Sequence, residues 1–173
     1  QINAEEIDLR ELLSLDDYYR TDSHWMQQRI LPVAEAICQA LGVPSAPAED
    51  YEAHELEGFK GVYYGQSALN PKPDTLTFLT NAAIEGATVQ RMNDRMKWVE
   101  TKVYVEENFG KENTDSYDVF LDGPEALLTI DNPNAATDRH LILFRDSFGS
   151  SITPLLIHSY AKITVVDLRY ANW

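Results

Sequence analysis

The spacing at which apolar residues recur changes twice near the C-terminal end of the chain. The apolar run Leu141–Phe144 leads directly into the polar turn Arg145–Gly149, and residues 150–160 then place their apolar positions at helical spacing. A second apolar run, Ile163–Leu168, follows at once. This pattern predicts a buried strand, a tight turn, a helix and a second strand. Because a helical connection joins parallel neighbours, we expect the two strands to pair in parallel.

A longer helix is predicted between Trp25 and Leu41. Apolar residues recur there at intervals of three or four, and Gly42, with Pro44 just beyond it, marks the end. Pro32 interrupts the early turns, so we expect the helix to be kinked there or to begin later. Further strands are predicted for residues 97–105, 117–121 and 126–130.

Ser147 lies where the first strand of the C-terminal unit ends and its helix begins. Backbone N–H groups at a helix start favour negative charge, which makes Ser147 the best candidate nucleophile in the chain. The alternative is that Asp146 or Ser147 only caps the helix, which both residue types commonly do. Since a nucleophilic serine needs a base, the choice between these interpretations depends on a suitably placed histidine.

The stretch Thr21–Trp25, with the sequence TDSHW, supplies a candidate base. Asp22 and His24 are two residues apart, and in an extended segment such residues lie on the same side of the chain. The carboxylate can then accept a hydrogen bond from one imidazole nitrogen and leave the other free to take a proton. The alternative is that Asp22 or Ser23 caps the following helix and that His24 is incidental.

Composition narrows the class of protein. The 173 residues are enough for one domain with a sizeable core, and we expect them to form a single domain that is a segment of a longer chain. The net charge of −14 argues against nucleic acid or an anionic membrane as a partner. The single cysteine, Cys38, excludes an internal disulfide framework. The remaining histidines have no metal-site spacing, so we expect neither a metal nor a cofactor.

Taken together, TDSHW and the later stretch Arg145–Gly149, RDSFG, resemble the bacterial DHHW proteins, which are similar to the SGNH-hydrolase-like domains of alginate O-acetyltransferases. The segments FKGVYYGQSA and YDVFLDG between them are also similar to that family. The resemblance implies an α/β fold with a mostly parallel sheet flanked by helices, SGNH-hydrolase-like or flavodoxin-like. The site is then expected at the carboxyl ends of the strands.

The resemblance also implies an acyl-transfer site. By motif match, Ser147 is the nucleophile, His24 the general base and Asp22 the residue that orients the histidine. Ser23 stands where the family name has its first histidine, as in the alginate enzymes, which also carry another residue there. The second donor of an oxyanion hole is not identified by the sequence, although glycines near Gly123 and between residues 58 and 65 are candidates.

Three residues are predicted to bind substrate. Arg145 replaces the glycine of common SGNH esterases, and a cation there either blocks a substrate pocket or binds an anionic sugar. Trp25 and Tyr64 are candidates for stacking on sugar rings, although aromatic residues lie more often in or beside a core.

The resulting function is an extracytoplasmic bacterial carbohydrate O-acetyltransferase or O-acetylesterase that forms an acetyl-Ser147 intermediate. Its expected partners are a cell-surface polysaccharide and an acetyl donor, with a membrane acyl-transfer protein as a candidate source of the acetyl group. The alternative is a non-catalytic SGNH-like module that binds a cell-surface glycan or a partner protein.

Overall fold

A computed structural model describes residue 4, residues 6–64, residue 66 and residues 71–170. Their strands are β1 (Glu52–Phe59), β2 (Asp74–Thr80), β3 (Thr88–Met92), β4 (Trp98–Thr101), β5 (Leu127–Asp131), β6 (His140–Phe144) and β7 (Lys162–Val166). Their α-helices are α1 (Leu31–Leu41), α2 (Ala82–Glu85) and α3 (Phe148–Leu156), and the short 3₁₀ turns include η3 (Gln27–Arg29) and η6 (Ser116–Val119). None of the described helices has the length and apolar character needed to cross a membrane.

The predicted strand–helix–strand unit is confirmed. Strands β6 and β7 pair in parallel, with Leu141 opposite Ile163 and Phe144 opposite Val166. Helix α3 connects them and begins at Phe148, directly after Ser147. The rest of the main sheet is added in the order β4-β3-β5-β7-β6, and each of its other three pairings is antiparallel.

The expectation of a mostly parallel, flavodoxin-like sheet flanked by helices is therefore wrong. Parallel neighbours need a long crossover that is usually helical, whereas antiparallel neighbours can be joined by a short turn. In the described part of the main sheet, only the β6–β7 connection carries such a helix. The β3–β4 connection is a tight turn around Asn93, whose carbonyl accepts the N–H of Met96.

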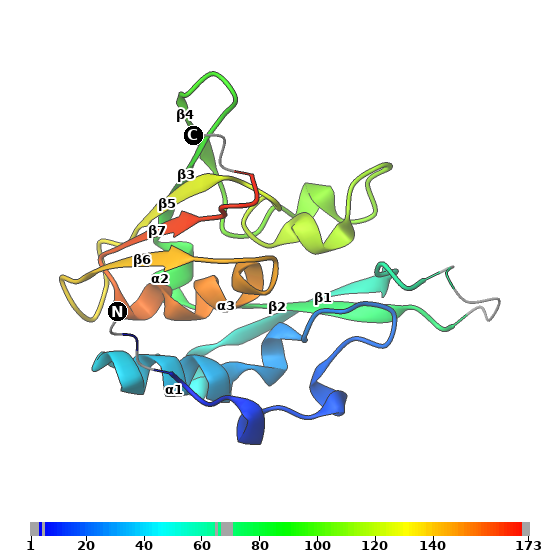
Figure 1. Cartoon of the computed structure of the whole chain (residues 1–173), viewed down its shortest axis with the longest axis horizontal. Helices are drawn as coiled ribbons and strands as arrows, with labels where there is room; N and C mark the ends of the chain where they lie inside the picture. The colour runs from blue at the N-terminus through cyan, green and yellow to red at the C-terminus, as the bar shows by residue number, and fades with distance from the viewer. Residues whose placement is uncertain (1–3, 5, 65, 67–70, 171–173) are drawn as a thin grey trace.

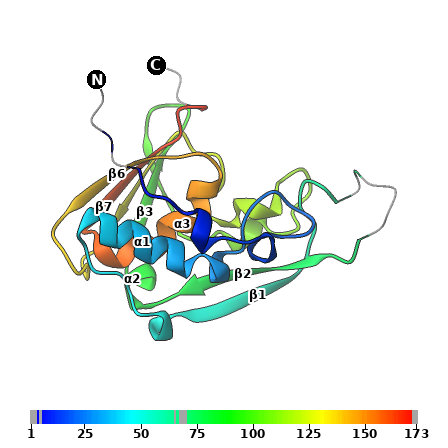
Figure 2. The ribbon, with the colours of Figure 1, turned by 60° about the horizontal axis from the view of Figure 1, so that its bottom comes forward.

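The helices lie on one face of this sheet (Figures 1 and 2). The facing side chains, which include Leu128, Ile130, Ile163 and Val165, are essentially fully buried and form the core together with α3. On the opposite face of β6, Ile142 is 59% and Phe144 64% exposed. Because neighbouring side chains of a strand point to opposite faces, the described helices cover one face of the main sheet and leave the face of Ile142 and Phe144 exposed.

A second, two-stranded sheet supports the N-terminal segment. Strands β1 and β2 pair antiparallel with Leu56 opposite Leu76, and they lie on the side of α3 away from the main sheet (Figure 1). The buried side chains of Phe59, Leu76 and Phe78 join this hairpin to the same core. The hairpin thereby provides the surface against which the TDSHW segment packs.

The predicted helix 25–41 is confirmed only over its second part. Helix α1 begins at Leu31, so that Pro32 falls in its first turn, where the missing N–H of proline costs no helical hydrogen bond. Gly42 ends the helix with a φ of 64°, a left-handed conformation that glycine adopts without a Cβ clash.

The three further strand predictions have different outcomes. The strand predicted over residues 97–105 covers only residues 98–101, and the strand predicted over 126–130 is confirmed as residues 127–131. Residues 116–119 instead form the 3₁₀ turn η6, and the prediction of a strand over 117–121 is wrong. This compact turn, not an extended strand, buries the apolar residues Tyr117, Val119 and Phe120. The apolar pattern of the sequence was therefore mistaken for that of a strand.

Candidate active site

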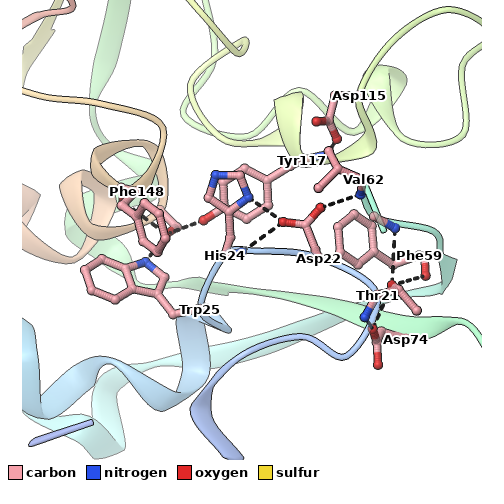
Figure 3. Close-up of polar contacts among 12 residues, drawn as sticks. Thr21, Asp22, His24, Trp25, Phe59, Val62, Asp74, Asp115, Tyr117 and Phe148 are labelled. Atoms are coloured by element: carbon pink, nitrogen blue, oxygen red, sulfur yellow. Dashed lines mark hydrogen bonds and ion pairs between the residues drawn. The ribbon is translucent and has the colours of Figure 1, made fainter. Parts of the chain in front are cut away.

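Asp22 and His24 form a hydrogen-bonded pair in a tight loop. The His24 ring Nδ1 lies 2.5 Å from Asp22 Oδ1, and the His24 backbone N–H donates to the same oxygen at 2.9 Å (Figure 3). The segment is not an extended entry to a helix, as the sequence suggested. A bridge between Tyr18 and Trp25 closes a bend that brings the two side chains together. The alternative of an N-cap is wrong for this loop, because α1 begins only at Leu31.

Hydrogen bonds hold the TDSHW loop against strand β2 and the segment that follows β1. Asp74 accepts hydrogen bonds from both the backbone N–H and the hydroxyl of Thr21, each at 2.8 Å. The N–H of Val62 donates to the second carboxylate oxygen of Asp22 at 2.9 Å. A Cβ at Gly61 would collide with the Asp22 side chain and the Thr21 carbonyl. The absence of a side chain at Gly61 therefore lets the backbone approach the Asp22 carboxylate.

The His24 ring is held on its faces as well as at its edge. It stacks on Tyr117, with ring centroids 3.9 Å apart and planes 10° from parallel, and contacts Phe148 at 5.0 Å. Its side chain is only 9% exposed. Nε2, the nitrogen that does not face Asp22, is buried and has no hydrogen-bond partner among the described residues. This nitrogen is free to accept a proton.

Ser147 immediately precedes α3, but its side chain does not cap the helix. The first helical amide, that of Phe148, is instead bonded to Asp146 Oδ1 at 3.0 Å. The capping interpretation therefore applies to Asp146 and not to Ser147. The Ser147 hydroxyl is left without a structural hydrogen bond in the part of the chain that the structure describes.

One pocket of about 310 Å³ brings the histidine and the serine together. Asp22 lies behind His24, outside the pocket lining. The hydroxyl of Ser147 is not hydrogen-bonded to His24 Nε2, since that nitrogen has no partner among the described residues. The full lining consists of His24, Asp115, Tyr117, Asp118, Gly123, Pro124, Arg145, Ser147, Ser150, Arg169 and Tyr170.

Ser151 connects the two parts of the site. Its Oγ accepts hydrogen bonds from Trp25 Nε1 at 2.8 Å and from the Tyr117 hydroxyl at 2.7 Å. Ser151 lies one helical turn after Ser147, Trp25 follows His24, and Tyr117 carries the ring that stacks on His24. This buried cluster fixes the start of α3 relative to the TDSHW loop.

Arg145 is a buried residue whose two terminal guanidinium nitrogens are bonded within the protein, while its buried Nε has no hydrogen-bond partner among the described residues. Its side chain is 2% exposed, and its guanidinium donates to the Gly123 carbonyl at 2.8 Å and to Ser150 Oγ at 2.5 Å. Burial lowers the pKa of Arg145, while nearby Asp167 opposes that shift. Gly149 has no room for a Cβ beside the Arg145 side chain. Arg145 thus holds the start of α3 against the Gly123 turn and lines the pocket without closing it.

The two predicted aromatic substrate-binding residues lie elsewhere. Trp25 is buried, and it lines a neighbouring groove formed with Phe148 and Leu168 rather than the pocket of His24. Tyr64 is half-buried in the loop after β1, with Lys60 Nζ 5.1 Å from its ring, and is not part of the pocket lining.

Neither of two glycines suggested as oxyanion donors has a free amide. The N–H of Gly123 donates to the Phe120 carbonyl at 3.1 Å. The N–H of Gly61 donates to Thr21 Oγ1 at 3.2 Å. The N–H of Ser147, at the start of α3, is the donor that the described structure leaves available.

The environment of Asp22 favours its charged form. Burial alone raises the pKa of this carboxyl, but hydrogen bonds from the His24 ring, the Val62 N–H and the His24 N–H outweigh it, and the pKa is lowered overall. Asp22 is therefore ionised at neutral pH and holds the proton of the imidazole on Nδ1.

Asp118, a carboxyl of the pocket lining, has the opposite environment. Burial and the neighbouring carboxylates of Asp115 and Asp122 raise the pKa of Asp118 to about 6. A carboxyl with a raised pKa stabilises the fold when protonated, and this contribution is lost as the pH rises through about 6. At neutral pH the ionised Asp118 thus destabilises the folded state.

Replacing Asp118 with asparagine is expected to raise the free energy of unfolding by about 1 kcal/mol near neutral pH, a figure reduced for the partial solvent exposure of the side chain. The gain should shrink at about pH 5, where Asp118 is already protonated in the folded state. Urea denaturation at the two pH values measures both effects. The exposed Asp138→Asn is the control, and a loss of stability in Asp118→Asn near pH 7 would contradict this account.

Sequence reasoning found the Asp22–His24 pair and Ser147 but missed the residues around them. Tyr117 and Asp118 lie in YDVFLDG, a segment noted only for its resemblance. The Val62 amide has one signal in the sequence, the preceding Gly61. Ser151 has none, since a serine inside an apolar helix does not show which groups it meets.

Comparisons with known proteins place this geometry in a wider context. The family model for DHHW proteins matches residues 9–166. A DHHW family protein from Eubacterium siraeum is similar over 91% of this chain and 52% of its own, with 27% identity and a TM-score of 0.74. A comparison with curated proteins finds no match.

Bacillus cereus PatB1 has the same fold at lower identity. Its structure is 22% identical, with a TM-score of 0.68 over 91% of this chain and 56% of its own. A second structure, with a sulfonyl adduct, is 23% identical with a TM-score of 0.67 over 90% of this chain and 53% of its own. The chain thus spans about half the length of these solved structures. Since the family model covers most of its residues, the chain belongs to the DHHW family.

Proposed function

We propose that the protein is a carbohydrate O-acetyltransferase or O-acetylesterase whose catalytic groups are Ser147, His24 and Asp22. The observation that carries the proposal is the pocket itself. Its lining contains the hydroxyl of Ser147, which makes no capping hydrogen bond at the start of α3. It also contains the imidazole of His24, which is bonded through Nδ1 to the ionised Asp22 and has no partner at Nε2 among the described residues. A nucleophile, a base and a group that orients the base are the parts that acyl transfer requires.

The first half of the reaction transfers the acetyl group to the enzyme. Ser147 Oγ attacks the carbonyl carbon of the ester, and its proton moves to His24 Nε2. Asp22 stabilises the imidazolium through Nδ1, and the N–H of Ser147 stabilises the oxyanion. The ester C–O bond then breaks, and the leaving oxygen takes the proton from His24. Acetyl-Ser147 and the free alcohol result.

The second half restores the serine. A hydroxyl of the acceptor sugar, or water in the esterase reaction, gives its proton to His24 Nε2 and attacks the acetyl carbon. The bond to Ser147 Oγ breaks, and that oxygen takes the proton back. The Ser147 hydroxyl must turn toward Nε2 for the first step, since no hydrogen bond joins them in the described structure.

The family resemblance supports the substrate class and the location. A cell-surface carbohydrate as acceptor, an extracytoplasmic site of action and a membrane acyl-transfer partner as acetyl donor all follow from it as proposals. The sulfonyl adduct recorded for PatB1 also supports the chemistry, because sulfonyl groups attach to activated nucleophiles.

Phenylmethylsulfonyl fluoride tests this proposal without a known substrate. We expect it to add one sulfonyl group to the wild-type protein, and peptide mass spectrometry should locate that group on Ser147. His24→Ala should slow the labelling strongly, because an unactivated serine reacts poorly near neutral pH. Ser147→Ala should remain unlabelled. Modification of another serine, or equal labelling without His24, would favour the non-catalytic glycan- or protein-binding module instead.

A further inference from the structure

The carboxylate of Asp118 lies on the pocket wall without a hydrogen-bond donor in the part of the chain that the structure describes. Its backbone is held by the turn itself, since its N–H donates to the Asp115 carbonyl and its carbonyl accepts from Asn108. A Cβ at Gly123 would lie 2.5 Å from the Asp118 Cγ. The carboxylate is thus packed directly over the backbone of Gly123.

The turn that presents Gly123 is unusual. Leu121, Asp122 and Gly123 have consecutive φ values of 55°, 61° and 78°, although only glycine adopts this region without a steric cost. Leu121 is nevertheless fully buried. Strained backbone persists where the surrounding structure enforces it and concentrates at functional sites. This turn places Gly123 between the Asp118 carboxylate and the guanidinium of Arg145.

The two arginines of the pocket both lie beside the buried carboxylate of Asp167. Arg169 forms a bidentate pair with Asp167, at 2.9 and 2.6 Å, and the guanidinium of Arg145 lies 3.9 Å from the same buried carboxylate. Asp115 accepts the N–H of Tyr117 at 2.9 Å. Arg145, Arg169, Asp115, Asp118 and Asp167 together carry one net negative charge. Among these three carboxylates, Asp118 is the one with no hydrogen-bond donor in the described residues.

A second observation shows that this wall faces a binding site. The buried Nε2 of His24, also without a partner, lines the same pocket as Asp118. In the proposed reaction Nε2 receives the proton of the attacking hydroxyl, so the reacting substrate lies beside it, and Asp118 on the same pocket lacks a donor that a ligand would supply. The volume of about 310 Å³ lies at the lower end of the range for small-molecule sites.

We propose that this pocket binds a cationic acyl acceptor, an amino sugar with a free amino group, and that Asp118 binds its ammonium group. The inference rests on the proposed function, because it places the acceptor beside Ser147. It also decides between the alternatives left open by Arg145. An anionic sugar would meet the unpaired carboxylate of Asp118. The Arg145 side chain is only 2% exposed, and its two terminal nitrogens are already bonded within the protein, so that only the buried Nε is without a partner among the described residues.

Binding of three sugars that differ in charge tests the proposal without any turnover. Methyl glucosaminide, methyl glucoside and methyl glucuronide share one ring and carry a positive, a neutral and a negative group. NMR titration near pH 7 should show the glucosaminide bound about tenfold more tightly than the glucoside, the size of one charge pair in a partly solvated site. The glucuronide should bind most weakly of the three.

Two variants separate a local effect from the overall charge of the protein. Asp118→Asn should bring the glucosaminide and the glucoside to equal affinity. Asp138→Asn removes the same charge from an exposed loop and should keep the tenfold preference. Equal affinities in the wild type, a preference that survives in Asp118→Asn, or no binding of the glucosaminide would each overturn the proposal. Failure of the acyl-transfer chemistry is recognised separately, by the absence of sulfonyl labelling at Ser147.

Discussion

Replacing Ser147 with alanine is expected to reduce turnover of p-nitrophenyl acetate by about 1,000-fold or more, because the attacking hydroxyl is removed and Ser150, the other serine of the pocket lining, is bonded to Arg145. The fold should be unaffected. The Ser147 side chain makes no capping hydrogen bond, and Asp146 continues to cap α3. We expect the free energy of unfolding to change by less than about 0.5 kcal/mol.

The measurement is steady-state hydrolysis followed by absorbance, with urea denaturation of the same preparations. Ser23→Ala is the matched control, since Ser23 lies in the TDSHW loop beside His24 but outside the pocket lining, and it should retain turnover. A Ser147→Ala protein that keeps full turnover would exclude the proposed nucleophile. An inactive protein that is also unfolded would show that Ser147 has a structural role, contrary to its free hydroxyl.

Asp22→Asn is expected to lower kcat by about 1,000- to 10,000-fold, close to the effect of His24→Ala. An asparagine can present an N–H to His24 Nδ1, which moves the imidazole proton to Nε2 and removes the base. The variant also weakens the bond from Val62 N–H, which we expect to cost about 1 kcal/mol of folding stability.

The decisive readout is the division between kcat and KM. Loss of the base should lower kcat with little change in KM, because Asp22 lies outside the pocket lining. Asp74→Asn is the comparison: it loosens Thr21 in the same loop without touching the imidazole, and its effect on kcat should be at least tenfold smaller. Equal losses in the two variants would show that Asp22 acts only by holding the loop.

The sequence was sufficient for the parts of the site that depend on local pattern. The change from strand to helix around Ser147 follows from residues that are close along the chain. The Asp22–His24 pair is also local, although a bend rather than the expected extended segment brings the two side chains together. The parallel pairing of β6 and β7 was predictable because their connection contains a helix.

The remaining features depend on contacts between distant segments. The direction of the other strands is set by connections that carry no clear pattern, and the expectation of a mostly parallel sheet was wrong for that reason. The apolar residues of η6 have the sequence pattern of a buried strand, but tertiary contacts bury them in a compact turn. The partners of His24 and Asp22, namely Tyr117 and Val62, come from separate loops that periodicity cannot place together.

The link from Trp25 to Ser151 spans 126 residues and has a consequence for biosynthesis. The unit β6–α3–β7 is contiguous and can form by local pairing, whereas the histidine loop reaches it only by closing a loop of 126 residues. On the proposed mechanism, Ser147 is synthesised after Asp22 and His24 and stays unreactive until this closure. Final folding would then act as the activation step, so that no reactive nucleophile exists while the chain is still being made or transported.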